Sequence, residues 1–331
     1  MFSIIANNHR NLTSLFKAPL ELEYGVFHCS ELTANNLEYE QTIDAFSEKW
    51  EHWNNLGEES TQKQQIWESE QKKWYLSLYG YKDLQNFAES LQRCPVILDA
   101  GCGTGFKSQW IATLAPHSLV IGMDASTSIY NAASRFKTTK NLVFVRGDIS
   151  NNSLCDSVID FINCDQVLHH TTNPQSTLRE FGRVSKASGK LNAYVYAKKA
   201  LPRELLDDFF ARNTKNFKLE EVWKLSEQLT TLGRLLHELN IEADFPDIPA
   251  LGIKGGPQNL QRFIYWNFIK CFWNPNYGEE VSIATNFDWY APNTSHKYSE
   301  SEFRELFRRT GWQQEFIHSE PACWTGRFIL Q

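Results

Sequence analysis

Three closely spaced glycines and one aspartate are the residues of this chain that point most directly to chemistry. Residues 96–105 read Val-Ile-Leu-Asp-Ala-Gly-Cys-Gly-Thr-Gly. An apolar run that ends in such a loop is typical of a buried parallel strand turning into a helix, where backbone N–H groups meet a ligand. The glycines alone would also suit a dinucleotide loop. Asp99 favours a different ligand, because a carboxylate at the strand end repels a pyrophosphate and attracts an ammonium group.

A second carboxylate follows at the distance of one crossover helix. Residues 119–124 have the pattern of another buried strand, and Asp124 comes nineteen residues after Gly105. An acid at the tip of the second strand is placed to accept hydrogen bonds from both ribose hydroxyls of a nucleoside. The two acids together predict a nucleoside that carries an ammonium group, and S-adenosylmethionine is such a ligand.

Two more strand patterns extend this alternation, over residues 142–146 and 158–163. The first leads into Gly147-Asp148-Ile149, and the second leads through Cys164 to the pair His169-His170. In order and spacing, the motifs at Asp99 to Gly105, Asp124, Gly147-Asp148 and Leu168 to Thr171 resemble those of the class I S-adenosylmethionine-dependent methyltransferases. The resemblance is close over roughly residues 94–200 and looser over the last thirty.

This resemblance implies an α/β fold, a doubly wound Rossmann-like sheet of seven strands that is mostly parallel and has an antiparallel last strand. It also implies contacts to the cofactor: the first loop around the methionine part, Asp124 on the ribose, Asp148 on the adenine amino group, and Ile149 against the ring. The cofactor-binding residues that we expect are Asp99, Gly101, Cys102, Gly103, Asp124, Ala125, Asp148, Ile149 and Cys164.

The methyl acceptor should meet residues that follow the fourth and fifth strands, because ligands of open parallel sheets lie beyond the carboxyl ends of the strands. His169 or His170 is the candidate general base, since a histidine has a pKa near neutrality. Alternatively, His170 hydrogen-bonds the start of the helix at Asn173. The residues that we expect to contact the substrate are Tyr196, Lys199, Trp289, Tyr290 and His296. The cluster around Trp289 could equally be a loop anchored by its aromatic side chains.

The bulk composition excludes several other classes. A net charge of −6 and a pI near 5.9 give no general attraction for nucleic acid. The seven cysteines are scattered without a Cys-x-x-Cys pair, which predicts neither a disulfide framework nor a metal site. Neither a signal-peptide pattern nor an apolar run of membrane-spanning length is present, so we expect a cytoplasmic protein without a membrane span.

The motifs of macromolecular methylation are missing from the expected positions. Asn163-Cys164-Asp165-Gln166 stands where an amino-methylating enzyme of DNA would carry an Asn/Asp-Pro-Pro-aromatic run. A small-molecule acceptor remains, methylated on an O or N atom by in-line displacement. The alternative function is a regulator or partner subunit that binds the cofactor without transferring its methyl group.

The sequence predicts four segments. Residues 1–90 form an N-terminal hairpin-like segment and a helical lid, and residues 91–200 form the cofactor-binding core. Residues 201–298 form a helical insertion over the substrate, and residues 299–331 return to the core with a helix and two strands. The lid aromatics Trp50, Trp53, Trp74 and Tyr75 either close over the sulfonium or pack in a core.

Two further patterns carry structural expectations. Residues 19–29 alternate like a short hairpin and resemble the back half of a zinc ribbon, but Cys29 stands alone, so we expect no metal there. In the insertion we expect helices over residues 202–212, 219–239 and 258–273, the last apolar on two sides. Burial within the monomer is the favoured interpretation of that helix, and a homodimer interface is the alternative.

Overall fold

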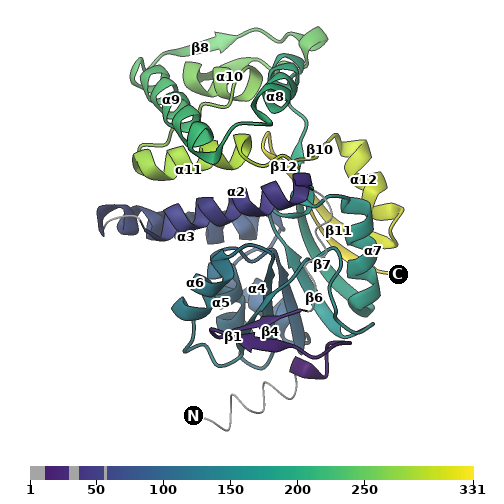
Figure 1. Ribbon diagram of the computed structural model, residues 1–331. Helices are drawn as coiled ribbons and strands as arrows, with labels where there is room; N and C mark the ends of the chain where they lie inside the picture. The colour runs from purple at the N-terminus through teal and green to yellow at the C-terminus, as the bar shows by residue number, and fades with distance from the viewer. Residues whose placement is uncertain (1–11, 30–36, 56–57) are drawn as a thin grey trace. The chain divides into compact units, whose positions relative to one another are not determined.

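The computed structural model describes residues 12–29, 37–55 and 58–331 (Figure 1). The chain folds into two compact units. Unit 1 comprises residues up to 43, residues 71–197 and residues 294–331, and unit 2 comprises residues 44–70 and 198–293. Two long helices, α2 (Leu37–Asn54) and α3 (Glu58–Leu78), each contribute to both units.

Unit 1 is built on one sheet, which has ten strands within the described residues. The strand order is β1-β2-β5-β4-β3-β6-β7-β12-β11, with β10 paired to β7. The strands are β1 (Glu21–Glu23), β2 (Val26–His28), β3 (Val96–Ala100), β4 (Leu119–Asp124), β5 (Leu142–Arg146), β6 (Ile159–Cys164), β7 (Ser185–Ala197), β10 (Lys297–Tyr298), β11 (Trp312–Ser319) and β12 (Cys323–Leu330).

The central strands β5, β4, β3, β6 and β7 are all parallel, and the last strand, β12, is antiparallel between β7 and β11. The predicted α/β fold with a mostly parallel sheet is therefore confirmed. The predicted count of seven strands differs from the structure, because β1, β2 and β10 join the sheet as well. The turn at Tyr24 and Gly25, both at positive φ (50° and 82°), folds the N-terminal hairpin. Its second strand, β2, pairs with β5 and places Phe27 in register with Val145.

Helices cover both faces of this sheet (Figure 1). In Figure 1, α5 and α6 lie on one side of it, and α7 and α12 lie on the other. The helix start expected at Asn173 is confirmed, since its side chain caps α7. The structure also shows a capping box of Ser299 with Glu302 at the start of α12. The helices of unit 1 besides α3 are α4 (Leu84–Leu91), α5 (Phe106–Leu114), α6 (Ser128–Arg135), η1 (Leu168–His170), α7 (Pro174–Val184) and α12 (Glu300–Arg308).

Unit 2 is mostly helical. The predicted helices near 202–212 and 219–239 are confirmed as α8 and α9. A two-stranded hairpin, β8 with β9, was not predicted. The elements of unit 2 besides its parts of α2 and α3 are α8 (Leu201–Thr214), α9 (Leu219–Glu238), β8 (Glu242–Phe245), η2 (Pro249–Leu251), β9 (Gly256–Asn259), α10 (Leu260–Asn267) and α11 (Gly278–Tyr290).

The helix predicted over residues 258–273 is wrong in extent, because α10 ends at Asn267 and residues 268–277 are irregular. Distant side-chain amides bind the backbone of this stretch in place of helical partners. The Asn286 side chain accepts from the N–H of Phe272 at 2.8 Å and donates to its carbonyl at 3.1 Å, and Gln261 donates to the carbonyl of Cys271 at 3.0 Å. Asn286 itself lies on α11, a helix that the sequence analysis missed.

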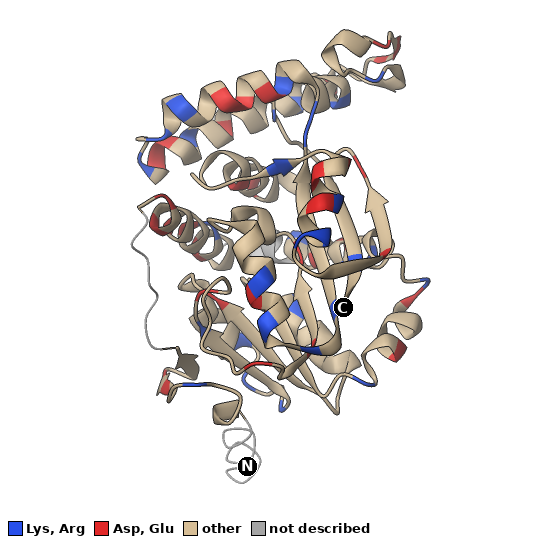
Figure 2. Cartoon of the chain, turned by 90° about the vertical axis from the view of Figure 1, so that its right-hand side faces the viewer, with Lys and Arg blue, Asp and Glu red and all other residues tan. Residues whose placement is uncertain are grey.

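Charged residues of both signs share the same helices, as Figure 2 shows. In α12, Glu300 pairs with Arg304 at 2.7 Å, and Glu305 pairs with Arg308 and Arg309 at 2.6 Å. Within the described part of the chain, no helix is both long and apolar enough to cross a membrane.

The core of unit 1 depends on aromatic packing beneath α12. Phe307 is 1% exposed and stacks on Phe328 with ring centroids 3.8 Å apart. We predict that Phe307→Ala lowers the free energy of unfolding by about 3–5 kcal/mol, because it removes buried area and leaves a cavity. The matched change at the half-exposed Leu84, Leu84→Ala, should cost less than about 0.5 kcal/mol. Urea unfolding followed by circular dichroism measures both, and equal losses would contradict the packing.

Candidate cofactor and acceptor site

The glycine loop joins the end of β3 to the start of α5 in a conformation that needs glycine. Gly101 and Gly105 have φ of 78° and 75°, and a Cβ on Gly101 would lie 2.4 Å from Cγ1 of Val167. The N–H groups of Gly101 and Cys102 both donate to the carbonyl of Met123, at 2.8 and 3.1 Å. The loop is therefore fixed against the end of β4, beside Asp124.

Asp99 is buried beneath this loop and is bound on both oxygens. Asp99 is only 2% exposed. Its carboxylate accepts hydrogen bonds from the Ser108 hydroxyl at 2.5 Å and from the Asn163 amide at 2.7 Å. Burial raises the pKa of Asp99, and the two hydrogen bonds oppose that rise. Asp99 thus ties β3 to the first turn of α5 and to the end of β6.

Asn163 extends this bonding into a network that sequence reasoning missed. The Tyr75 hydroxyl donates to the Asn163 side-chain oxygen at 2.8 Å and accepts from the Asn192 amide at 2.8 Å. Tyr75 was considered for a lid over the sulfonium, but here it is a fully buried member of the network. The signal available in the sequence was Asn163 itself, a polar residue that follows the apolar pair Phe161-Ile162 near the end of β6.

A second buried carboxylate, Asp165, was also missed. It pairs with the ammonium of Lys107 on α5 and accepts from the Tyr79 hydroxyl at 2.8 Å. Tyr75 lies in the last turn of α3 and Tyr79 directly follows the helix, and the N–H of Tyr79 donates to the Tyr75 carbonyl at 3.1 Å, so the end of α3 supplies both hydroxyls. These bonds hold the segment after β6 against α5 and α3.

The two acids at the next strand ends are less buried and form local turns. Asp124 accepts from the N–H of Gly103 at 2.7 Å, and from the N–H and hydroxyl of Ser126 at 2.8 and 2.6 Å. Asp148 accepts from the N–H of Ser150 at 2.8 Å and from the hydroxyl of Tyr39 at 2.9 Å. Tyr39 was not predicted, and burial together with the charge of Asp148 raises its pKa.

The other predicted cofactor residues lie on the same edge of the sheet. Ile149 is 5% exposed, and Ala125, next to Asp124, is half-buried. Burial raises the pKa of the Cys102 and Cys164 thiols well above its usual value, so both are held as thiols. The structure thus brings the nine predicted cofactor residues to the carboxyl ends of β3, β4, β5 and β6.

The structure also gathers three of the predicted catalytic and substrate residues around His169. Its ring lies 3.8 Å from the Tyr196 ring and 4.2 Å from the His170 ring, measured between centroids. The backbone N–H of His296 donates to the backbone carbonyl of His169 at 2.8 Å, and Nε2 of the His296 ring lies 3.1 Å from the Thr171 carbonyl. Nδ1 of His170 lies 2.9 Å from the carbonyl of Thr294, a partner other than the Asn173 end of α7 considered from the sequence.

The remaining three predicted substrate residues belong to unit 2. Lys199 lies 5.8 Å from the Trp289 ring centroid, and the Tyr290 hydroxyl donates to the carbonyl of Lys270 at 3.0 Å. Trp289 and Tyr290 sit in the last turn of α11, in contrast to the loop considered as the alternative.

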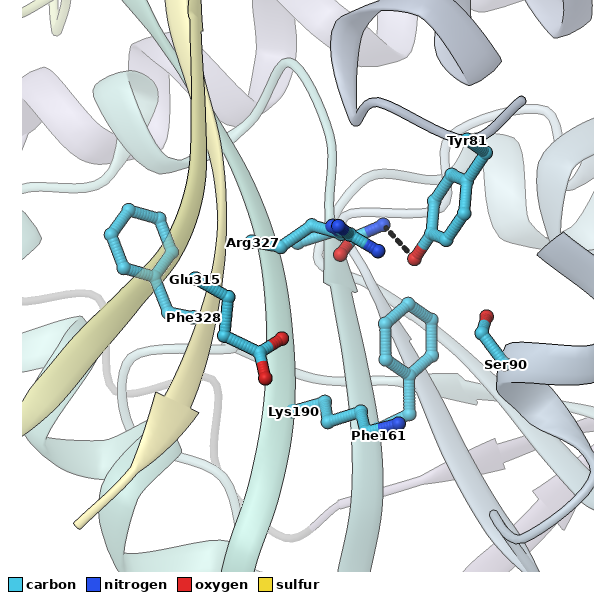
Figure 3. Close-up of a pocket in the computed structure, with 8 residues that line it drawn as sticks. Tyr81, Ser90, Phe161, Lys190, Glu315, Arg327 and Phe328 are labelled. Carbon is cyan, nitrogen blue, oxygen red and sulfur yellow. Dashed lines mark hydrogen bonds between the residues drawn. The ribbon is translucent and has the colours of Figure 1, made fainter. Parts of the chain in front are cut away.

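The cavity in Figure 3 is separate from these strand ends. It is lined by Tyr81 and Ser90 together with residues of β6, β7, β11 and β12, and its volume is about 30 Å³. That volume holds one or two water molecules, whereas ligand pockets span about 300–1,000 Å³. The cavity is therefore a packing defect of unit 1 and not a substrate site.

Comparison with known proteins agrees with this geometry. A methyltransferase-domain family model matches residues 94–243. A ubiquinone biosynthesis O-methyltransferase of Coxiella burnetii is 31% identical over 197 residues, which cover 53% of this chain and 76% of that protein. The chain belongs to the class I S-adenosylmethionine-dependent methyltransferases.

Other relatives match over the shared domain alone. A malonyl-[acyl-carrier protein] O-methyltransferase of Legionella pneumophila is 30% identical over 29% of this chain and 34% of its own. An uncharacterized Synechococcus protein is 33% identical, and the chain spans 26% of its length. The chain thus spans about a third or less of these two relatives. A solved S-adenosylmethionine-dependent methyltransferase from Aquifex aeolicus has a TM-score of 0.41 at 15% identity, over 80% of this chain and 98% of that one.

The donor set of this site fits S-adenosylmethionine, the cofactor of the family. Carboxylates accept hydrogen bonds from ribose hydroxyls and an adenine amino group, and they attract an ammonium group. The nearest lysine on α5, Lys107, is paired with Asp165, and the guanidinium of Arg146 donates to the Ala125 carbonyl and the Tyr130 hydroxyl. These strand ends are therefore suited to a nucleoside with a cationic side chain and not to a diphosphate.

The Asp99 network generates a prediction with a defined pH dependence. Asn163→Asp would place a second carboxylate 2.7 Å from Asp99, and two such groups cannot both ionise. One of them then keeps a proton, so its pKa in the folded state rises above that in the unfolded state. The folded state binds more protons from about pH 4 upward, and stability falls as the pH rises.

We predict that Asn163→Asp lowers the free energy of unfolding by about 2–4 kcal/mol at pH 8 and by less at pH 5. Urea unfolding at the two pH values measures the difference. The exchange variant Asp99→Asn with Asn163→Asp restores one carboxylate and one amide, and it should recover most of the loss. A loss of equal size at both pH values would show that the two side chains do not interact.

Proposed function

We propose that this protein transfers the methyl group of S-adenosylmethionine to an O or N atom of a small molecule. The observation that carries the proposal is the row of three carboxylates, Asp99, Asp124 and Asp148, at the ends of the neighbouring strands β3, β4 and β5. When bound, S-adenosylmethionine supplies a methyl group on a sulfonium, which is already an activated donor, so positioning contributes most to the rate.

The three carboxylates have different roles in binding the cofactor. Asp124 and Asp148 are half-buried and accept hydrogen bonds from the nucleoside, on the ribose and the adenine amino group. Asp99 is bound by Ser108 and Asn163, so it holds the loop in shape and sets the negative potential that favours an ammonium group. In this proposal Gly101, Cys102 and Gly103 surround the methionine part, and Ala125, Ile149 and Cys164 line the nucleoside site.

His170 is the proposed general base. Its Nδ1 faces a backbone carbonyl, which can only accept, so Nδ1 carries the hydrogen and Nε2 carries the lone pair. The attacking atom of the acceptor forms a bond to the methyl carbon, the carbon–sulfur bond breaks with its electron pair on sulfur, and Nε2 takes the acceptor proton. His169 is fully buried and packs against Tyr196, which suits a supporting role.

The acceptor is a small molecule in this proposal. The net charge of −6 disfavours a polyanionic substrate, and two relatives are named O-methyltransferases. We also propose the four-segment division, with residues 1–90 as a hairpin and lid, 91–200 as the cofactor core, 201–298 as the substrate cap, and 299–331 completing the core. The proposed substrate residues are Tyr196 and His296 in unit 1, and Lys199, Trp289 and Tyr290 in unit 2.

The cofactor site is tested by calorimetric titration with S-adenosylhomocysteine. Asp124→Ala should weaken binding by about 10- to 100-fold, because it removes a charged acceptor and leaves the ribose hydroxyls unpaired. Asp160→Asn is the matched control, since Asp160 lies at the opposite end of the sheet and pairs with Lys186. Equal effects of the two changes, or no binding to the unaltered protein, would contradict the assignment.

Methyl transfer itself is tested with labelled S-adenosylmethionine and an extract of cell metabolites. Once an acceptor is labelled, His170→Asn should lower kcat by about 100-fold and abolish the acidic limb of its pH profile. The homocysteine product should still bind as tightly as before. Tight binding without any labelled product would support the alternative, a cofactor-binding regulator or partner subunit.

A further inference from the structure

Unit 2 contains a buried lysine without a counter-ion. Lys270 lies in the irregular stretch after α10 and is 6% exposed. Among the described residues, its ammonium forms no hydrogen bond or ion pair and contacts only the Trp289 ring, whose centroid is 4.7 Å away. A buried charge without a partner is costly and is normally compensated by an ion of opposite sign.

Other cations converge on the same ring. The Arg203 guanidinium lies 5.0 Å from the Trp289 centroid, and the Lys199 ammonium lies 5.8 Å from it. Arg203 is itself 1% exposed. Three cations around one indole repel each other, and a single ring contact offsets only about 2 kcal/mol of that cost.

The carboxylates that face this cluster already have partners. Asp207 accepts from Nε of Arg203 at 3.0 and 3.1 Å, and Asp288 pairs with Lys49 at 2.8 Å. Glu204 accepts from the backbone N–H of Lys199 at 2.7 Å. The positive charge that these acids do not offset is centred on Lys270, whose pKa is lowered to about 7. Burial is the largest cause, Arg203 and Lys49 act in the same direction, and Asp288 and Asp207 oppose the shift.

We propose that Lys270, Arg203 and Lys199, grouped around Trp289, bind an oxyanion, either a carboxylate or a phosphate, on a small-molecule ligand. The anion is the missing counter-ion of Lys270, and the indole gives it an apolar, water-poor wall where charge pairing is strong. That this oxyanion belongs to the methyl acceptor rests on the proposed function. The binding itself does not.

The test is calorimetric titration of the full chain with sodium benzoate and, separately, with inorganic phosphate, at constant ionic strength. At pH 6 we expect saturable 1:1 binding of at least one of them, and the one that binds identifies the source of the oxyanion. Binding of benzoate should weaken by up to about 100-fold between pH 6 and pH 9, because Lys270 loses its proton about two pH units below the upper value.

Lys270→Gln should weaken anion binding by at least about 10-fold, which is the loss of one charge-assisted hydrogen bond. Lys224→Gln is the matched control, since Lys224 is an exposed lysine on α9 of the same unit, and it should bind as the unaltered protein does. If Lys270→Gln does not fold, Lys270→Met keeps the length of the side chain without the charge. Circular dichroism at pH 6 reports folding for each variant.

Failure of this proposal is distinguishable from failure of the proposed function. Binding that is the same in Lys270→Gln and Lys224→Gln, or no binding of either anion at pH 6, would overturn the oxyanion site. A titration of the same proteins with S-adenosylhomocysteine should be unaffected by either variant. Absence of that binding in the unaltered protein would overturn the proposed function and leave the anion result standing.

Discussion

The buried carboxylate of Asp99 is the interaction on which the candidate site depends. Its two oxygens join β3 to the next element, α5, through Ser108, and to the end of β6, 64 residues along the chain, through Asn163. A buried charge of this kind is tolerated only when both oxygens have donors. The glycine loop therefore takes its shape from the strand below it as well as from its own backbone, and the strand ends stay in register with each other.

Much of unit 1 follows from local patterns. Apolar runs that lead into Asp99, Asp124 and Asp148 predicted parallel strands, and Asn173 predicted the start of α7, because each signal lies within a few residues of its effect. The hydrogen-bond partners of these acids could not be predicted in this way. Tyr39, Tyr75 and Tyr79 bind side chains 86 to 109 residues away, and no local pattern specifies such a pairing.

In unit 2, sequence periodicity predicted the structure less well. A two-sided apolar pattern predicted one long helix, but side-chain amides of Gln261 and Asn286 bind the backbone of residues 271 and 272 and hold it irregular. The break leaves Lys270 buried beside Trp289. Periodicity reports which residues are apolar, and it cannot report that a distant amide competes for the backbone. The charge cluster could not be predicted either, because Lys199 and Arg203 lie far along the chain from Lys270 and Trp289.

The central claim is that the nucleoside binds at the Asp124 carboxylate and the loop above Asp99. A crystal structure of the protein with S-adenosylhomocysteine tests this most directly. The account predicts that both ribose hydroxyls lie within about 3.2 Å of the Asp124 carboxylate and that the homocysteine ammonium lies against the loop above Asp99. A nucleoside bound elsewhere, with Asp124 still turned only toward Gly103 and Ser126, would contradict it.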